Sequence, residues 1–110
     1  MTARSRRVRQ ALGLGRRLEA EARPAFGAAG LVIEGGGFGW FPLYPGGPQQ
    51  PCERWRVLGT PCEVAIAFWL VDDHWRAHLT IVKRTAWTRD VKNGIELAQF
   101  VVPIVRRNCP

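Results

Sequence analysis

The stretch EVAIAFWLVDDHWRAHLTIVKRT, residues 63–85, decides the fold because it has the pattern of a long β-hairpin. Two runs rich in β-branched and aromatic residues flank Asp72-Asp73, and acidic residues of this kind are common in turns. If these two residues form the loop, Val71 faces His74, and pairing proceeds outward one residue at a time.

This register sorts the hairpin side chains onto two different faces. One face is entirely apolar and pairs Leu70 with Trp75, Phe68 with Ala77, Ile66 with Leu79, and Val64 with Ile81. The other face pairs Val71 with His74, Trp69 with Arg76, Ala67 with His78, Ala65 with Thr80, and Glu63 with Val82. A slip of one residue would mix the two sets, so the pattern itself selects the register.

The apolar face is expected to form the core. The second face is the one surface where strand geometry brings several functional side chains together. We expect a ligand or nucleic-acid face made of Trp69, Arg76, His78, Thr80 and Arg84.

Residues 1–24 predict a basic amphipathic helix that Pro24 ends. Apolar residues recur at helical spacing, namely Val8, Ala11, Leu12, Gly15, Leu18 and Ala22. Off this stripe lies a basic arm, formed by Arg6, Arg7, Arg9, Arg16 and Arg17. Residues 1–23 hold seven arginines and two glutamates, which gives +5 of the total net charge of +7. This charge indicates attraction to polyanions.

Residues 25–52 are rich in glycine and proline, which favours a loop region with one short strand at 31–34. The loop is unusually aromatic, because it contains Phe38, Trp40, Phe41 and Tyr44. A loop of this kind in a small domain is typically a lid, a binding loop or a cover over the core.

Residues 53–110 are expected to complete the sheet and add a C-terminal element. The alternating segment 53–58 predicts a third strand beside the hairpin. Residues 87–102 favour a helix capped by Thr88 and stopped by Pro103, with a short edge strand at 104–105. Asn93-Gly94 is also a strong hairpin signal, so a hairpin stays open as the alternative.

The chain is therefore expected to be a single α+β domain over residues 1–110. Its N-terminal helix packs on a small antiparallel β-sheet, a meander centred on the hairpin 63–85, and a C-terminal helix follows.

No catalytic, metal or cofactor site is predicted. LVIEGGGFGW has Trp40 where a dinucleotide-binding fingerprint needs its last glycine. Cys52, Cys62, His74 and His78 do not have zinc-finger spacing, and a strand would hold the two histidines about 13 Å apart. The tetrad HLTI at 78–81 resembles half of the signature of the 2H phosphoesterases, but the second half is missing from the sequence. An enzyme is the less favoured alternative.

The three cysteines, Cys52, Cys62 and Cys109, match no disulfide scaffold. The sequence shows no secretory signal and no apolar run of about 20 residues. We therefore expect a cytoplasmic protein with reduced thiols and no membrane contact.

The polar hairpin face has three interpretations: a helix covers it, it binds nucleic acid, or it binds a protein or small ligand. We expect a non-enzymatic binding protein, with nucleic acid as the leading partner through the basic helix and this face. The alternatives are a protein-interaction module, such as a homodimeric regulator or inhibitor, and a small-ligand protein or enzyme with a pocket near His78.

Overall fold

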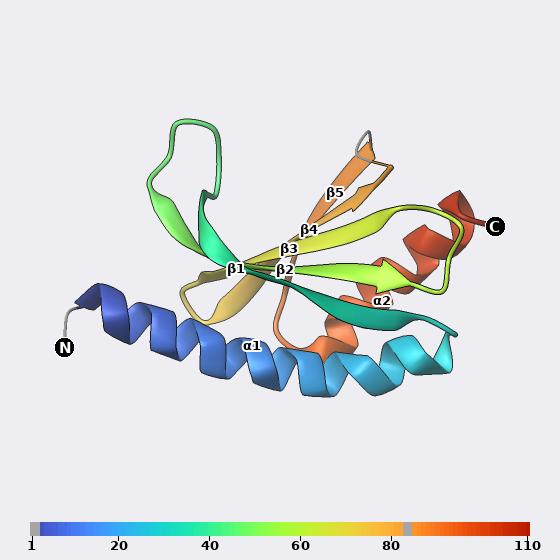
Figure 1. Cartoon of the computed structure of the whole chain (residues 1–110), viewed down its shortest axis with the longest axis horizontal. Coiled ribbons are helices and arrows are strands. Elements are labelled where there is room, and N and C mark those ends of the chain that lie inside the picture. Colours follow the sequence, from blue (N-terminus) through green and yellow to red (C-terminus); the bar gives the residue numbers. More distant parts are fainter. Residues whose placement is uncertain (1–2, 83–84) are drawn as a thin grey trace.

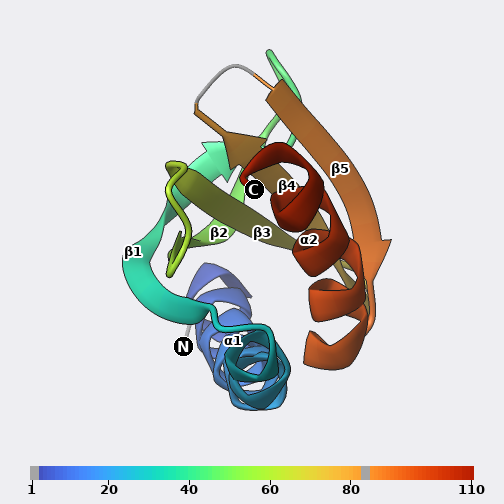
Figure 2. The ribbon, with the colours of Figure 1, turned by 90° about the vertical axis from the view of Figure 1, so that its right-hand side faces the viewer.

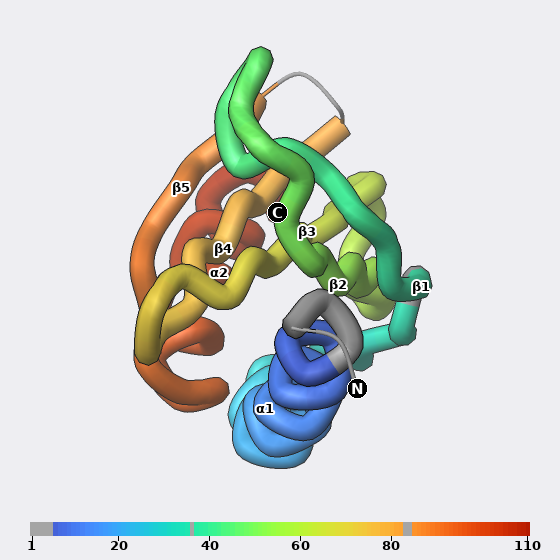
Figure 3. The backbone as a smooth tube through the Cα atoms, turned by 90° about the vertical axis from the view of Figure 1, so that its left-hand side faces the viewer, coloured from blue at the N-terminus to red at the C-terminus, as the bar shows by residue number. Residues whose placement is uncertain are grey.

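The computed structural model describes residues 3–82 and 85–110, which form two helices and a five-stranded antiparallel sheet (Figure 1). The elements are α1 (Ala3–Ala28), β1 (Val32–Pro42), β2 (Gln49–Leu58), β3 (Val64–Val71), β4 (His74–Ile81), β5 (Thr85–Val91) and α2 (Gly94–Asn108). The strands follow one another in sequence order across the sheet. The sheet curves around the helices, with α1 against β1 and β2 and α2 against β4 and β5 (Figures 2 and 3). The predicted α+β class is confirmed.

The hairpin register is also confirmed, from Val71 opposite His74 to Val64 opposite Ile81. Asp72 has a positive φ of 57°, a conformation that aspartate tolerates at a tight reversal. The apolar face of the hairpin is the centre of the core. Phe68 is completely buried there and makes edge-on ring contacts with Trp55 at 4.4 Å and Trp75 at 6.3 Å between centroids.

The glycine-rich region was wrongly predicted to be mostly irregular. Most of it belongs to strands β1 and β2, and the connection between them spans only residues 43–48. The register of β1 shifts between Gly35 and Gly37, which marks a bulge, and Gly37 has a φ of 118° that L side chains rarely adopt. The glycines therefore serve a bulged strand.

The prediction that Pro24 ends the first helix is wrong, and so is the prediction that Pro103 ends the second. A proline in a helix removes one backbone hydrogen bond and leaves the carbonyl four residues earlier without its donor. Both prolines are exposed, so water can reach these positions. The edge strand predicted at 104–105 is part of α2.

The ambiguous segment 87–102 contains both a strand and a helix. Its first part is β5, and Asn93-Gly94 starts α2 instead of forming a hairpin turn. The Asn93 side chain, and not Thr88, caps this helix, accepting a hydrogen bond from the Glu96 backbone N–H at 2.9 Å. A side chain at Gly94 would overlap the α1 backbone at Leu18 and Ala22, so this glycine allows the two helices to cross closely.

A disulfide joins Cys62 to Cys109, so the expectation of reduced thiols is wrong for these two residues. It links the turn before β3 to the end of α2. The third cysteine, Cys52, is free and buried, and burial raises the pKa of its thiol to about 11.

Within the described residues, neither helix combines the length and the apolar character that crossing a membrane requires.

Glu53 is a half-buried carboxylate between β2 and α1. Its Oε1 accepts a hydrogen bond from Trp55 Nε1 at 3.3 Å, and its other oxygen lies where a side chain at position 15 would sit, so Gly15 makes room for it. Burial raises the pKa of Glu53, and the nearby charge of Glu19 acts in the same direction.

We expect Glu53→Gln to stabilise the protein near neutral pH and to have little effect in acid. A raised pKa in the folded state means that Glu53 favours folding below its unfolded-state pKa. This contribution is lost as the pH rises through the folded-state pKa. Glutamine is never charged and keeps an acceptor for Trp55. Urea unfolding at acidic and neutral pH measures the difference, and a variant destabilised equally at both would contradict the account.

Candidate functional site: the outer face of the sheet

The outer face is the side of the sheet turned away from α1 and α2. It carries the polar set predicted from the hairpin, and in the described part of the chain neither helix covers it. Two rows of side chains cross the strands on this face. The first row is Cys52, Trp69, Arg76 and Asp90, and the second is Arg54, Ala67, His78 and Thr88.

Arg76 and Asp90 form the principal ion pair of the outer face. Arg76 Nε donates to Asp90 Oδ1 at 2.9 Å, and Nη2 donates to Oδ2 at 3.4 Å. This pairing raises the pKa of Arg76 and lowers the pKa of Asp90. His74 Nε2 also lies 3.3 Å from Asp90 Oδ2. Arg76 is opposite Trp69 as predicted, but its position is fixed by an acid that the sequence analysis did not connect to it.

His78 and Thr80 lie beside Arg76 on the same strand. His78 Nδ1 is 3.0 Å from Thr88 Oγ1, and the Thr80 hydroxyl donates to the Ala65 carbonyl at 3.5 Å. Their partners across β3 are Ala67 and Ala65, whose small side chains keep this part of the face shallow. The predicted residues Trp69, Arg76, His78 and Thr80 are therefore brought together. Arg84 lies outside the described residues.

The connection between β1 and β2 forms one wall of a pocket of about 300 Å³ on the outer face. The lining residues are Pro42, Leu43, Tyr44, Pro45, Trp69, Arg76, His78 and Thr88. Trp69 Nε1 donates to the Phe41 carbonyl at 3.1 Å and so links the sheet to the start of this wall. The volume lies at the lower end of the range for small-ligand sites, about 300–1,000 Å³.

The four aromatic residues predicted as one loop divide between different places. Tyr44 lines the pocket, and Phe41 lies on the outer face with the Arg54 guanidinium stacked on its ring, 4.1 Å from the centroid. Phe38 and Trp40 alternate with Phe41 along β1, so they point to the opposite side of the strand.

The basic arm is exposed but does not extend the outer face. Its five arginines lie on α1, whose buried stripe of Ala11, Leu18, Ala22 and Phe26 faces the inner side of the sheet. The arginines therefore mostly project away from the sheet. Arg7 reaches the sheet, where it donates a hydrogen bond to the side chain of Gln50 in β2, and the charge of Arg16 acts on Glu53 in the same strand.

The outer face has only a small positive excess of its own. Arg76 is neutralised by Asp90, and Arg56 lies 3.7 Å from Glu34. Arg54 stacks on Phe41.

Sequence reasoning missed Arg54, Thr88 and Asp90. The alternation of Trp87 and Arg89 with Thr88 and Asp90 was the signal for β5, but it was assigned to a helix.

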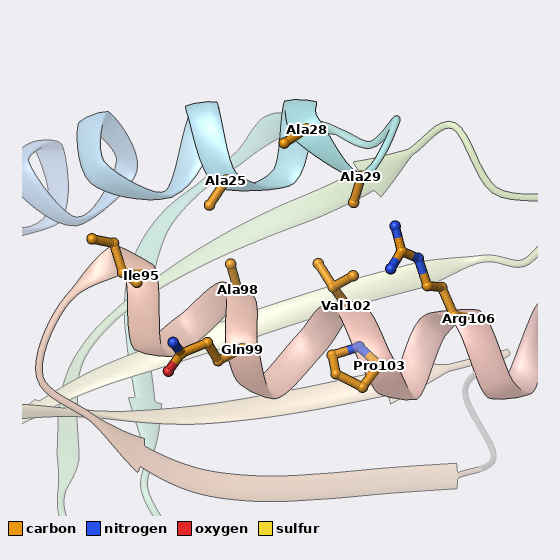
Figure 4. Close-up of a pocket in the computed structure, with 9 residues that line it drawn as sticks. All are labelled: Ala25, Ala28, Ala29, Ile95, Ala98, Gln99, Val102, Pro103 and Arg106. Atoms are coloured by element: carbon orange, nitrogen blue, oxygen red, sulfur yellow. The ribbon is translucent and has the colours of Figure 1, made fainter.

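A second pocket, an apolar groove of about 330 Å³, lies between α1 and α2 (Figure 4). Ala25 of α1 and Ala29, just after its end, face Ala98 and Val102 of α2 across it, and Arg106 lies at one end. Ile95 at the other end is 56% exposed. The groove contains few polar groups, so it offers contact area rather than chemistry.

In the part of the chain that the structure describes, no three His, Cys, Asp or Glu side chains are grouped to hold a metal ion. No protein-family model, curated protein or solved structure matches this chain.

Proposed function

We propose that the outer face binds single-stranded nucleic acid and that the protein acts as a non-enzymatic binding module. The observation that carries this proposal is the pocket on an open sheet face, where Trp69 and Tyr44 lie beside Arg76 and His78. Proteins that bind single strands combine aromatic side chains, on which bases stack, with basic groups that hold phosphates.

The two basic regions would contribute in different ways. Arg54 and Arg76 lie on the outer face and can contact the bound nucleic-acid strand directly. The basic arm lies on the far side of α1, so most of it acts through longer-range attraction, which salt screens over about 10 Å at 0.1 M. Arg7 of the arm contacts the sheet directly through Gln50 in β2.

We expect Trp69→Ala to weaken binding of a labelled single-stranded oligonucleotide by about 5- to 150-fold, the loss of one stacked base. Because the tryptophan ring carries no charge and contacts no phosphate as an ion, its loss should leave the dependence of affinity on salt unchanged. Replacing Arg6, Arg7, Arg9, Arg16 and Arg17 together by glutamine should reduce that dependence instead. Fluorescence anisotropy between about 50 and 200 mM salt measures both effects.

Trp69→Phe is the matched control, because it keeps an aromatic ring and loses the indole hydrogen bond to Phe41. It should retain most of the affinity. Undetectable binding of any single strand at low salt would remove the proposal, as would equal binding by the wild type and Trp69→Ala.

The alternative is a protein-interaction module, including a homodimeric regulator or inhibitor. The observation in its favour is the apolar groove between the helices with the exposed Ile95. A small-ligand protein or enzyme would use the same pocket near His78 as the leading proposal.

A cytoplasmic location remains part of the proposal, and the disulfide gives a way to test it. Cytosolic thiols are normally kept reduced, whereas disulfides persist in oxidising compartments. The test is the redox state of Cys62 and Cys109 after their thiols are blocked directly in cells. Reduced thiols would support a cytoplasmic location, and an intact disulfide would indicate an oxidising compartment.

A further inference from the structure

We infer that the pocket beside Tyr44 and Trp69 receives a single nucleobase with a carbonyl oxygen at C6 of a purine or C4 of a pyrimidine, namely guanine, thymine or uracil, in preference to adenine, which has an amino group there. This inference rests on the proposed function, because it assigns one base of the bound strand to a defined place on the outer face.

The walls of the pocket suit a flat aromatic ligand. Trp69 contributes from β3 in the sheet, and Tyr44 contributes from the 43–48 connection. Pro42, Leu43 and Pro45 make the rest of the connection side apolar. A planar base can therefore contact aromatic surface from two independent elements.

The Trp69 indole and the backbone that carries Tyr44 are held in place before any ligand binds, whereas the Tyr44 side chain itself is 58% exposed. The Trp69 indole is fixed by its hydrogen bond to the Phe41 carbonyl at 3.1 Å. The Tyr44 carbonyl accepts a hydrogen bond from the Gly47 N–H at 3.0 Å. A side chain at position 47 would overlap the Tyr44 ring, so Gly47 lets the connection close against that ring. Preorganisation of this kind reduces the entropic cost of binding.

The polar side of the pocket includes Arg76, which has only hydrogen-bond donors, and His78, whose role as donor or acceptor depends on its tautomer. Arginine has five N–H donors in a fixed plane, and Asp90 engages Nε and Nη2 of Arg76. Asp90 thus orients the guanidinium, and the Nη1 donors remain for a ligand. His78 is held through Nδ1 by Thr88, which leaves Nε2 as its second polar atom at the site.

Donors of this kind select for carbonyl-bearing bases. Guanine offers the O6 and N7 acceptors, and thymine and uracil offer carbonyl oxygens. Adenine presents an amino donor at the corresponding position, which would oppose the Arg76 donors. The discrimination expected from a good pairing of this type is about 5- to 150-fold.

The test is isothermal titration calorimetry with guanosine, uridine and adenosine monophosphates, with ribose 5-phosphate as the base-free control. Guanosine and uridine monophosphates should bind more tightly than adenosine monophosphate, and ribose 5-phosphate should bind weakest. Tyr44→Ala should weaken the first two by about 5- to 150-fold. Ile95→Ala is the matched control, because Ile95 lies in the groove between α1 and α2, away from the outer face, and it should change nothing.

The same variants are then measured with the single-stranded oligonucleotide. Loss of affinity for both mononucleotide and oligonucleotide in Tyr44→Ala supports a base of the strand in the pocket. Oligonucleotide binding that ignores Tyr44→Ala, or a preference for adenosine monophosphate, overturns the pocket inference and leaves the proposed function standing. Tyr44-dependent binding of mononucleotides without oligonucleotide binding overturns the proposed function and assigns the pocket to free nucleotides.

Discussion

Replacing Phe68 by alanine should lower the free energy of unfolding by about 3–5 kcal/mol. Phe68 is fully buried at the centre of the hairpin, between the rings of Trp55 and Trp75. Truncation removes the transfer free energy of the ring and leaves a cavity that rigid neighbours cannot fill. Because small domains are stable by only about 5–15 kcal/mol, the variant should be near the limit of folding. Urea denaturation followed by circular dichroism measures the change.

Leu58→Ala is a suitable control for this variant. Leu58 belongs to the same sheet but is 39% exposed, so its truncation should cost less than about 1 kcal/mol. Equal losses in the two variants would mean that the apolar face of the hairpin is not the core.

Removal of the disulfide should cost about 2–4 kcal/mol, because the bond closes a long loop between residues that are 47 positions apart. In the unfolded chain this cross-link restricts many conformations, and Cys62→Ala with Cys109→Ala releases them. The wild type treated with a reductant should unfold at the same lower urea concentration as the double variant.

Cys52→Ala provides the comparison, since Cys52 is free and the disulfide remains in that variant. It should keep its sensitivity to reductant, whereas the double variant should lose that sensitivity. A wild type whose stability does not respond to reductant would contradict the cross-link between the β2–β3 turn and α2.

The central hairpin could be predicted because one face is apolar at every residue pair from 64 to 81, whereas every pair on the other face includes a polar or charged residue. Strand β1 could not be predicted in the same way, because glycine has no side chain to show alternation and its conformational freedom usually indicates a turn. The strand forms because Ile33 is buried and Gly37 permits the bulge. Pro24 and Pro103 were wrongly predicted to end their helices, because at exposed positions a helix tolerates the missing backbone hydrogen bond.

The candidate site was predicted in part for the same reason. Strand alternation placed Trp69, Arg76 and His78 on one side, and the structure brings them together. The partners Asp90 and Thr88 come from β5. The sequence analysis assigned this segment to the following helix, because the apolar spacing from Val91 onward fits a helical period. The relation between the basic arm and the outer face depends on which side of the sheet α1 packs, and residue spacing within one helix does not contain that information.

The most direct test of the outer face as a binding surface is to follow the NMR signals of the tryptophan indole N–H groups while a single-stranded oligonucleotide is titrated into the protein. Trp69 lines the pocket, whereas Trp55 and Trp75 are buried beneath the helices. The account predicts that the Trp69 indole signal shifts strongly, while those of Trp55 and Trp75 barely move. An unchanged Trp69 signal at saturation, or shifts confined to backbone signals around Ile95 and Ala98 in the groove between the helices, would contradict it.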